Sequence, residues 1–174
     1  KTLFPYTTLF RSSDVIVLIG PMGVGKSTVG RKLAKALKVR FVDTDALFTA
    51  ANGPITKYFE EHGEPAFRRG EEDAVLQALS EPGVIATGGG AVLSELTRER
   101  LKSATVVYLT TDGKHIASRL KNGNRPLLSD GIESWQRIYD ERKPVYESVC
   151  DFKVNTSGQP LTATVADIRE KLGI

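Results

Sequence analysis

The chain has 174 residues, 40% of them hydrophobic and 26% charged, and its formal net charge at pH 7 is +3. This length fits one domain, which can bury roughly 70% of the surface that its unfolded chain exposes and therefore needs no disulfide or metal to hold it. No apolar run approaches the ~20 residues of a membrane-spanning helix, so we expect a soluble protein with no membrane partner.

Cys150 is the only cysteine of the chain, which excludes an intrachain disulfide and a cysteine metal cluster. A lone thiol suits a reducing compartment, so we expect a cytoplasmic protein in which Cys150 is a small apolar residue of the core. The expected oligomeric state is a monomer.

The first twelve residues, KTLFPYTTLFRS, differ in character from the rest of the chain. They resemble the translation of a sequencing-library adapter, so we expect residues 1–12 to be a non-native segment and residues 13–174 to be the domain. Lys1 and Arg11 are the only charged residues of this segment; without it, 22 basic residues face 21 acidic ones and the net charge is +1. The remaining basic residues form no run, which argues against a nucleic-acid partner.

From residue 15 onward, short β-branched runs alternate with longer patterns of helical spacing. The expected strands are 15–20, 39–44, 84–89, 105–110 and 151–156. The expected helices are 25–37, 54–80, 94–102, 113–122, 133–149 and 162–173. Such alternation predicts right-handed βαβ units, and therefore an α/β protein whose parallel sheet lies between layers of helices.

Residues 122–131, NGNRPLLSDG, join two of the helical patterns and are rich in Gly, Pro and Asn. A connection of this length in a compact domain is often functional. We therefore interpret residues 122–131 as a lid.

The stretch GPMGVGKST, residues 20–28, fits the phosphate-binding pattern G-x-x-x-x-G-K-S. An expected strand precedes it and an expected helix follows it, which is the context that this motif requires. Its backbone N–H groups and the helix N-terminus form an anion site, Lys26 can bridge the β- and γ-phosphates, and the Ser27 hydroxyl can ligate Mg²⁺. The residues expected to hold the nucleotide here are Gly23, Val24, Gly25, Lys26, Ser27 and Thr28.

Two carboxylates, Asp43 and Asp45, end the second expected strand in the stretch FVDTD. A spacing of two in an extended chain directs both side chains to one side, and ligands of α/β sheets bind beyond the carboxyl ends of the strands. One aspartate could hold Mg²⁺ through water while the other faces an acceptor hydroxyl. The alternative is that either residue only caps the helix that begins near ALFTA.

Four further stretches carry candidate ligand-binding groups. Arg68 lies in a helical pattern with Glu71 three residues later, a pairing typical of a solvated helix face. The glycines 88–90 directly follow a strand and can leave backbone amides open as a nest for an oxygen-rich ligand, or they form a flexible turn. Arg125 lies on the expected lid and Arg142 in the last long helix but one, and each alone is typical of a surface residue.

Taken together and in order, these stretches resemble the shikimate kinase family. The motifs are GPMGVGKST, DTD, EPAFRR, TGGGAV, NRPLL and ERKPVY, and the resemblance covers about residues 15–173. The resemblance implies transfer of phosphate from ATP, with Mg²⁺, to the 3-hydroxyl of shikimate in aromatic amino-acid biosynthesis. It also implies the fold of P-loop kinases of the nucleoside monophosphate kinase type: a five-stranded parallel sheet of order 2-3-1-4-5, flanked by helices, with a mobile lid.

The resemblance assigns roles to the candidate residues. Asp45 is implied as the base at the acceptor hydroxyls, and Asp43 as the partner of Ser27 at Mg²⁺. Arg68 and Arg142 are implied to hold the substrate carboxylate, which suits the two-pronged geometry of a guanidinium. The substrate-binding region implied is about 44–70.

The glycine stretch and two more residues complete the implied site. Gly89, with Gly88 and Gly90 on either side, is implied to face the ring hydroxyls. Arg125 is implied to close over the ATP phosphates, where it would add catalytic charge to that of Lys26. Gln159, in the stretch NTSGQP near the last strand, is the expected adenine contact.

Two other functions remain open. A different P-loop kinase of small molecules, such as a gluconate kinase, would keep Lys26 and Ser27 but would need no pair of Arg68 and Arg142. A P-loop binding module without catalysis would need no Asp45.

Overall fold

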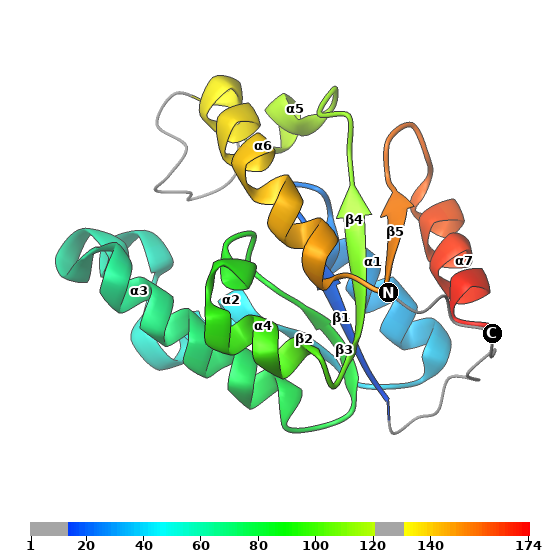
Figure 1. Ribbon diagram of the computed structural model, residues 1–174, viewed down its shortest axis with the longest axis horizontal. Coiled ribbons are helices and arrows are strands. Elements are labelled where there is room, and N and C mark those ends of the chain that lie inside the picture. Colours follow the sequence, from blue (N-terminus) through cyan, green and yellow to red (C-terminus); the bar gives the residue numbers. More distant parts are fainter. Residues whose placement is uncertain (1–13, 121–130) are drawn as a thin grey trace.

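A computed structural model describes residues 14–120 and 131–174 of the chain (Figure 1). The expected non-native segment 1–12 lies outside these ranges. So does the expected lid 122–131 apart from Gly131, and with it Arg125. The interpretations of these two segments therefore stay predictions.

A five-stranded parallel sheet of order β2-β3-β1-β4-β5 forms the centre of the fold. The strands are β1 Val15–Ile19, β2 Phe41–Asp43, β3 Gly83–Ala86, β4 Thr105–Thr110 and β5 Phe152–Asn155. In the register, Val17 of β1 lies between Ile85 of β3 and Val106 of β4. The expected sheet and its strand order are confirmed.

Helices cover both faces of the sheet, as Figure 1 shows. The helices are α1 Lys26–Leu37, α2 Thr44–Asn52, α3 Ile55–Leu79, the 3-10 turn η1 Ala91–Leu93, α4 Glu95–Leu101, α5 Ile116–Leu120, α6 Ile132–Val149 and α7 Leu161–Lys171. α1 and α7 pack on one face, and the end of α3, α4 and α6 pack on the other. Within the two described ranges, no helix combines the length and apolar content that crossing a membrane requires.

β1 shows why the central strand is apolar throughout. Its alternate residues Ile16 and Leu18 contribute to the cluster with α1 and α7, whereas Val17 and Ile19 contribute to the cluster under α6. All four are fully buried. A parallel strand with helices on both sides has no solvated face, so VIVLI carries no polar residue.

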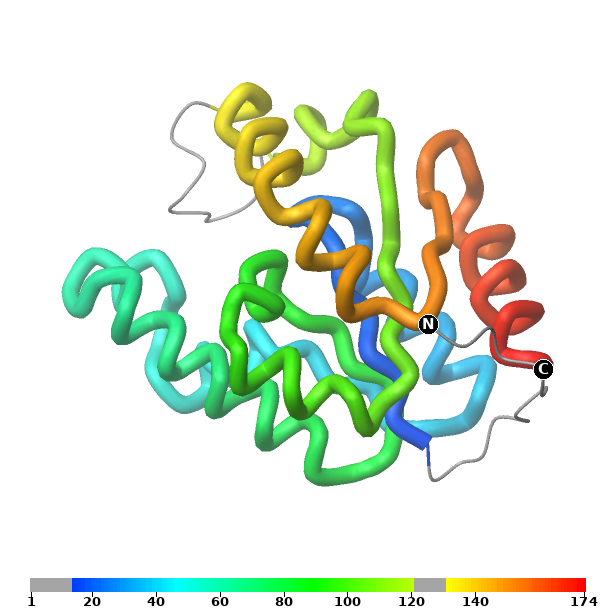
Figure 2. The backbone as a smooth tube through the Cα atoms, in the orientation of Figure 1, coloured from blue at the N-terminus to red at the C-terminus, as the bar shows by residue number. Residues whose placement is uncertain are grey.

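α2 and α3 form an arm with a core of its own, made by Phe48, Phe67 and Ala74. Figure 2 shows α3 extending away from the sheet. The helix expected at 54–80 is present, but its backbone breaks at Gly63, where φ is 81° and ψ 171°. Phe48 and Phe67 meet edge to face with ring centroids 5.1 Å apart. This arm holds most of the expected substrate-binding region.

Candidate active site

The turn between β1 and α1 has the backbone of a phosphate-binding loop. Gly20, Gly23 and Gly25 have φ values of 144°, 78° and 100°, which L-residues with a side chain rarely adopt. At Gly20 a Cβ would also lie 2.5 Å from the carbonyl oxygen of Leu109. Both conformation and space therefore require glycine at the start of this loop.

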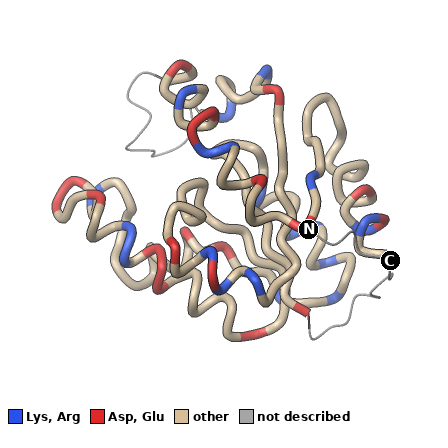
Figure 3. Tube along the Cα trace, in the orientation of Figure 1, with Lys and Arg blue, Asp and Glu red and all other residues tan. Residues whose placement is uncertain are grey.

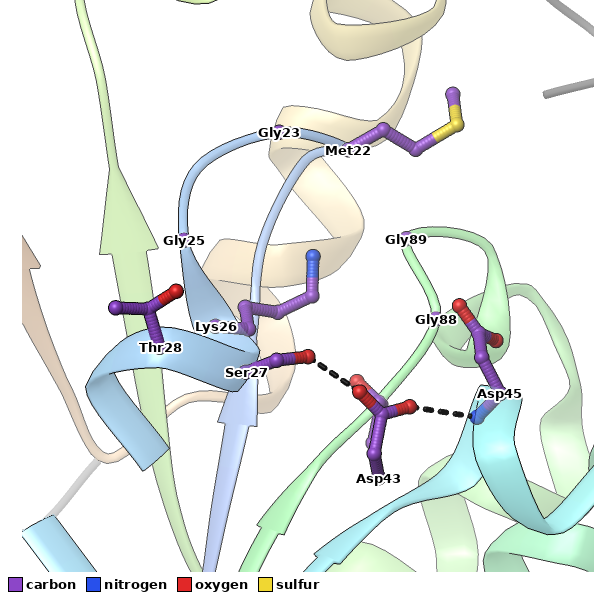
Figure 4. A pocket seen from close by; sticks show the side chains of 11 residues that line it. Met22, Gly23, Gly25, Lys26, Ser27, Thr28, Asp43, Asp45, Gly88 and Gly89 are labelled. Atoms are coloured by element: carbon purple, nitrogen blue, oxygen red, sulfur yellow. Dashed lines mark hydrogen bonds between the residues drawn. The ribbon is translucent and has the colours of Figure 1, made fainter. Parts of the chain in front are cut away.

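Lys26 opens α1 and places its ammonium inside this loop. Figure 4 shows the Lys26 side chain beneath the loop. This side chain is buried, and Nζ donates to the carbonyl oxygens of Gly20 at 2.7 Å and Pro21 at 2.8 Å. Val24 buries its side chain in the core, so only its backbone can face a phosphate. Thr28 lies one residue further along α1 and is exposed.

Ser27 and Asp43 join the loop to the end of β2. The Ser27 hydroxyl donates to Oδ2 of Asp43, and Oδ1 of Asp43 accepts from the backbone N–H of Asp45 at 2.9 Å and of Ala46 at 3.3 Å. Asp43 is therefore the N-cap of α2, and it also faces the loop. Asp43 therefore caps the helix and also lines the cleft, so the two interpretations do not exclude each other for this residue.

The extended spacing expected for Asp43 and Asp45 is wrong. β2 ends at Asp43 because this residue caps α2, and Asp45 lies in the first turn of the helix instead of two residues along a strand. The carboxylate of Asp45 nevertheless points to the same cleft, toward Gly88 and Gly89 (Figure 4).

A cleft of about 240 Å³ brings the loop and the two aspartates together. Its lining residues are Met22, Gly23, Gly25, Lys26, Ser27, Thr28, Asp43, Asp45, Thr87, Gly88 and Gly89. The carboxyl ends of β1, β2 and β3 all reach it, which is where ligands of α/β sheets bind.

The glycines 88–90 have no positive φ, so what distinguishes these positions is the little space around them. A Cβ at Gly88 would lie 2.7 Å from Oε2 of Glu71 and 3.0 Å from Oδ1 of Asp45. At Gly90 it would overlap the guanidinium of Arg68. The expectation of open amides is wrong for Gly88, whose N–H donates to the hydroxyl of Thr44 at 3.3 Å.

Arg68 is held from two sides by carboxylates. Its Nη1 lies 2.9 Å from Oε1 of Glu71, and its Nη2 lies 3.2 Å from Oε1 of Glu64. The pairing with Glu71 is confirmed, but a solvated face is wrong for this pair because Glu71 is buried. Burial raises the pKa of the Glu71 carboxyl above its ordinary value, and the neighbouring Arg68 counteracts part of that rise.

Arg142 comes to the same place from α6. Its side chain is buried, and its charge acts on the hydroxyl of Tyr146 and on the carboxylate of Glu71. The field of Asp45 also acts on Glu71. The structure thus gathers both expected arginines and Asp45 around Glu71. These residues belong to helices on which short acidic and basic segments follow one another, as Figure 3 shows for α3 and α6.

Sequence reasoning missed Arg119 of α5, whose Nη1 donates to the carbonyl oxygens of Gly23 at 3.0 Å and Val24 at 3.4 Å. It lies in a short helical stretch with nothing in its pattern to separate it from surface arginines. Gln159 is exposed in the connection between β5 and α7, and it does not line the cleft. Its adenine contact stays a prediction.

A phosphate-binding loop between a strand and a helix, with an acidic pair, the partly buried Arg68 and the buried Arg142 beside it, defines a P-loop kinase of a small molecule. Comparison with known proteins gives the family. The sequence model of the family described as shikimate kinase matches residues 22–173. The chain belongs to the shikimate kinase family.

Individual relatives agree over nearly the whole chain. A shikimate kinase from Corynebacterium efficiens is 40% identical over 162 residues, which cover 91% of this chain and 96% of the relative. A solved shikimate kinase from Acinetobacter baumannii, in complex with shikimate, superposes with a TM-score of 0.87 at 34% identity, covering 96% of this chain and 95% of the other.

A gluconokinase from Sinorhizobium meliloti shares the fold, with a TM-score of 0.61 and 21% identity over 94% of this chain and 98% of its own. This likeness concerns the fold alone. The alternative of a gluconate kinase therefore gains no support from it.

Proposed function

We propose that this chain transfers the γ-phosphoryl group of ATP to the 3-hydroxyl of shikimate, giving shikimate 3-phosphate and ADP. The observation that carries the proposal is the cleft in which the phosphate-binding loop faces Asp45, with Arg68 and Arg142 gathered behind it around Glu71. A phosphate donor and an acidic, hydroxylated acceptor need these two sets of groups at one place.

The nucleotide half of the site is built from the loop and the first turn of α1. The backbone N–H groups of residues 23–28 and the N-terminus of α1 attract the phosphates. Lys26 neutralises the β- and γ-phosphate oxygens. To do so, its ammonium replaces its hydrogen bonds to the carbonyl oxygens of Gly20 and Pro21 with hydrogen bonds to phosphate.

The residues present fit Mg²⁺ bound together with ATP. Ser27 and Asp43 place a hydroxyl and a carboxylate oxygen side by side, and oxygen is the donor that Mg²⁺ prefers. Among residues 14–120 and 131–174, no group of three or more His, Cys, Asp or Glu could hold a metal alone, so the phosphates must complete the shell. When bound, Mg²⁺ neutralises charge that develops on the phosphate oxygens.

The acceptor half is built from α2, α3, the glycines 88–90 and α6. Arg68 and Arg142 bind the carboxylate of shikimate, and the close-packed turn at Gly89 lies against its ring hydroxyls. Asp45 accepts the proton of the 3-hydroxyl as that oxygen attacks the γ-phosphorus, and the bond to the β–γ bridging oxygen breaks to release ADP. Positioning and charge neutralisation supply the catalysis.

Several further assignments rest on sequence motifs. Arg125 of the expected lid adds charge at the phosphates, and Gln159 contacts the adenine. Residues 13–174 form the kinase domain, with residues 44–70 as its substrate-binding region. We propose that the protein acts as a monomer in the cytoplasm.

A coupled assay of ADP release with ATP and Mg²⁺ tests the function, with shikimate and gluconate as separate acceptors. Turnover with shikimate and its loss in the Asp45→Asn variant are expected. Turnover with gluconate alone would assign a different kinase, and nucleotide binding without turnover on either acceptor would assign a binding module.

A further inference from the structure

One face of α6 carries Trp135, Tyr139, Arg142 and Tyr146, at spacings that keep them in line along the helix. All four side chains are buried. Only Arg142 of these was expected in the site. The other three make polar contacts that packing alone does not explain.

Trp135 contacts the phosphate-binding loop. Its indole Nε1–H donates to the carbonyl oxygen of Met22 at 2.7 Å, and its ring is 1% exposed. Met22 also approaches the glycine turn, because a Cβ at Gly89 would lie 3.2 Å from the Met22 nitrogen and 3.1 Å from its Cγ. Met22 therefore contacts both α6 and the turn at Gly89.

Tyr146 contacts the glycine turn itself. Its hydroxyl donates to the carbonyl oxygen of Gly89 at 2.5 Å, and the charge of Arg142, one turn earlier on α6, acts on the same hydroxyl. Burial raises the pKa of the Tyr146 hydroxyl to about 12, so it stays protonated and keeps donating at neutral pH. One phenol thus contacts the turn within the field of a residue proposed to bind the acceptor carboxylate.

Tyr139 lies between these two residues on α6, but its hydroxyl contacts the sheet and neither of the two loops. Its hydroxyl pairs with that of Tyr108 in β4 at 2.8 Å. Its ring packs against Trp135 with centroids 5.1 Å apart. This bond fastens α6 to the sheet instead of to either loop.

We propose that α6 is a common support that sets the spacing between the two halves of the active site. Trp135 positions the phosphate-binding loop through Met22, and Tyr146 positions the glycine turn through Gly89. Both are positioning residues for the proposed reaction, on which this inference rests. Their effect is large enough to measure because a misplacement of about 1 Å between reacting groups can cost about 10²-fold in rate.

The test compares Tyr146→Phe and Trp135→Phe with a matched variant, Tyr139→Phe. Tyr146→Phe and Tyr139→Phe each remove one buried hydroxyl from the same helix face. Loss of a single hydrogen bond corresponds to about a fivefold change. Tyr146→Phe is expected to raise the KM for shikimate about fivefold or more with the KM for ATP within twofold. Trp135→Phe is expected to raise the KM for ATP, and Tyr139→Phe to leave both unchanged.

A second readout needs no turnover. Trp135 is the only tryptophan of the chain, so ADP titrated into the wild-type protein is expected to change its fluorescence. Calorimetry is expected to show ADP binding weakened about fivefold in Trp135→Phe and unchanged in Tyr139→Phe. If all three variants have the same KM values and the same dissociation constant for ADP, the inference is overturned. A wild-type protein that binds ADP but does not turn over shikimate would overturn the proposed function, while the ADP measurements still decide the role of Trp135.

Discussion

Replacing Arg68 by lysine separates the geometry of this side chain from its charge. In the structure each terminal nitrogen of Arg68 donates one N–H to a glutamate: Nη1 donates to Glu71, and Nη2 donates to Glu64. Each of these nitrogens has a second N–H. A guanidinium can therefore still donate to a substrate carboxylate from more than one nitrogen, which a lysine ammonium cannot reproduce.

The expected magnitude follows from the loss of one charge-assisted hydrogen bond. Such a bond contributes about 1.5 to 3 kcal/mol, and about 1.4 kcal/mol is a factor of ten in an equilibrium constant. We therefore expect Arg68→Lys to raise the KM for shikimate tenfold or more. The KM for ATP is expected to stay within twofold, because Arg68 does not line the cleft around the phosphate-binding loop.

Steady-state kinetics with each substrate varied in turn measure this effect, and Arg69→Lys is the matched control. Arg69 is the next residue of the same helix, but it lines a groove between α2 and α3 away from the glycine turn. Its replacement is expected to change neither KM. An equal rise of both KM values in Arg68→Lys, or the same rise in Arg69→Lys, would refute the carboxylate-binding role of Arg68.

Three further changes test other parts of the site. Asp45→Asn keeps the shape of the side chain but cannot accept a proton, so kcat is expected to fall about 10² to 10⁴-fold with an unchanged melting temperature; a fall below threefold contradicts the role as base. Ser27→Ala is expected to raise the KM for Mg-ATP, and Ser27→Thr, which keeps the hydroxyl, to restore it. Burial raises the pKa of Glu71 in the folded state above its ordinary value of 4.5. Between the unfolded and the folded pKa, the folded state keeps a proton that the unfolded state has lost, so the contribution of Glu71 to the free energy of unfolding falls as pH rises above 4.5. In melts from pH 4 to 7, Glu71→Gln is expected to gain stability relative to the wild type toward neutral pH.

The sheet could be predicted because its signals are local. The apolar runs at residues 15–20 and 105–110 match β1 and β4 to within one residue, and the helical patterns between the strands predict the α/β class. The match is poorer elsewhere: α2 is absent from the expected helices, and α5 begins at Ile116 where the expected helix begins at residue 113. Strand order came only from family resemblance, since no local pattern states which strands pair. The extended placement of Asp45 failed because Asp43 caps a helix immediately, a competition between two uses of the same short polar residue.

The loop and Arg68 could be found because they lie within contiguous motifs, whereas the groups that hold them could not. Glu71 has the i+3 spacing of a surface ion pair, and only the fold shows that the glycine turn buries it. Trp135 and Tyr146 belong to a helix pattern typical of core residues. Their hydrogen bonds go to backbone carbonyls more than 50 residues away in the sequence, which carry no side-chain signal.

The three glycines at 88–90 show how the fold couples its two halves without a dedicated side chain. A Cβ at Gly88 or Gly90 would press on Glu71 or Arg68 of α3, whereas a Cβ at Gly89 would press on Met22 of the phosphate-binding loop. The turn is thus in contact with the acceptor half on both sides and with the nucleotide half at its middle. Because none of the three has a positive φ, a side chain at these positions would meet close neighbours and no backbone strain of the left-handed region. A kinase that must bring a charged donor and a charged acceptor together gains from such a turn, since backbone fills the space between them and adds no charge of its own.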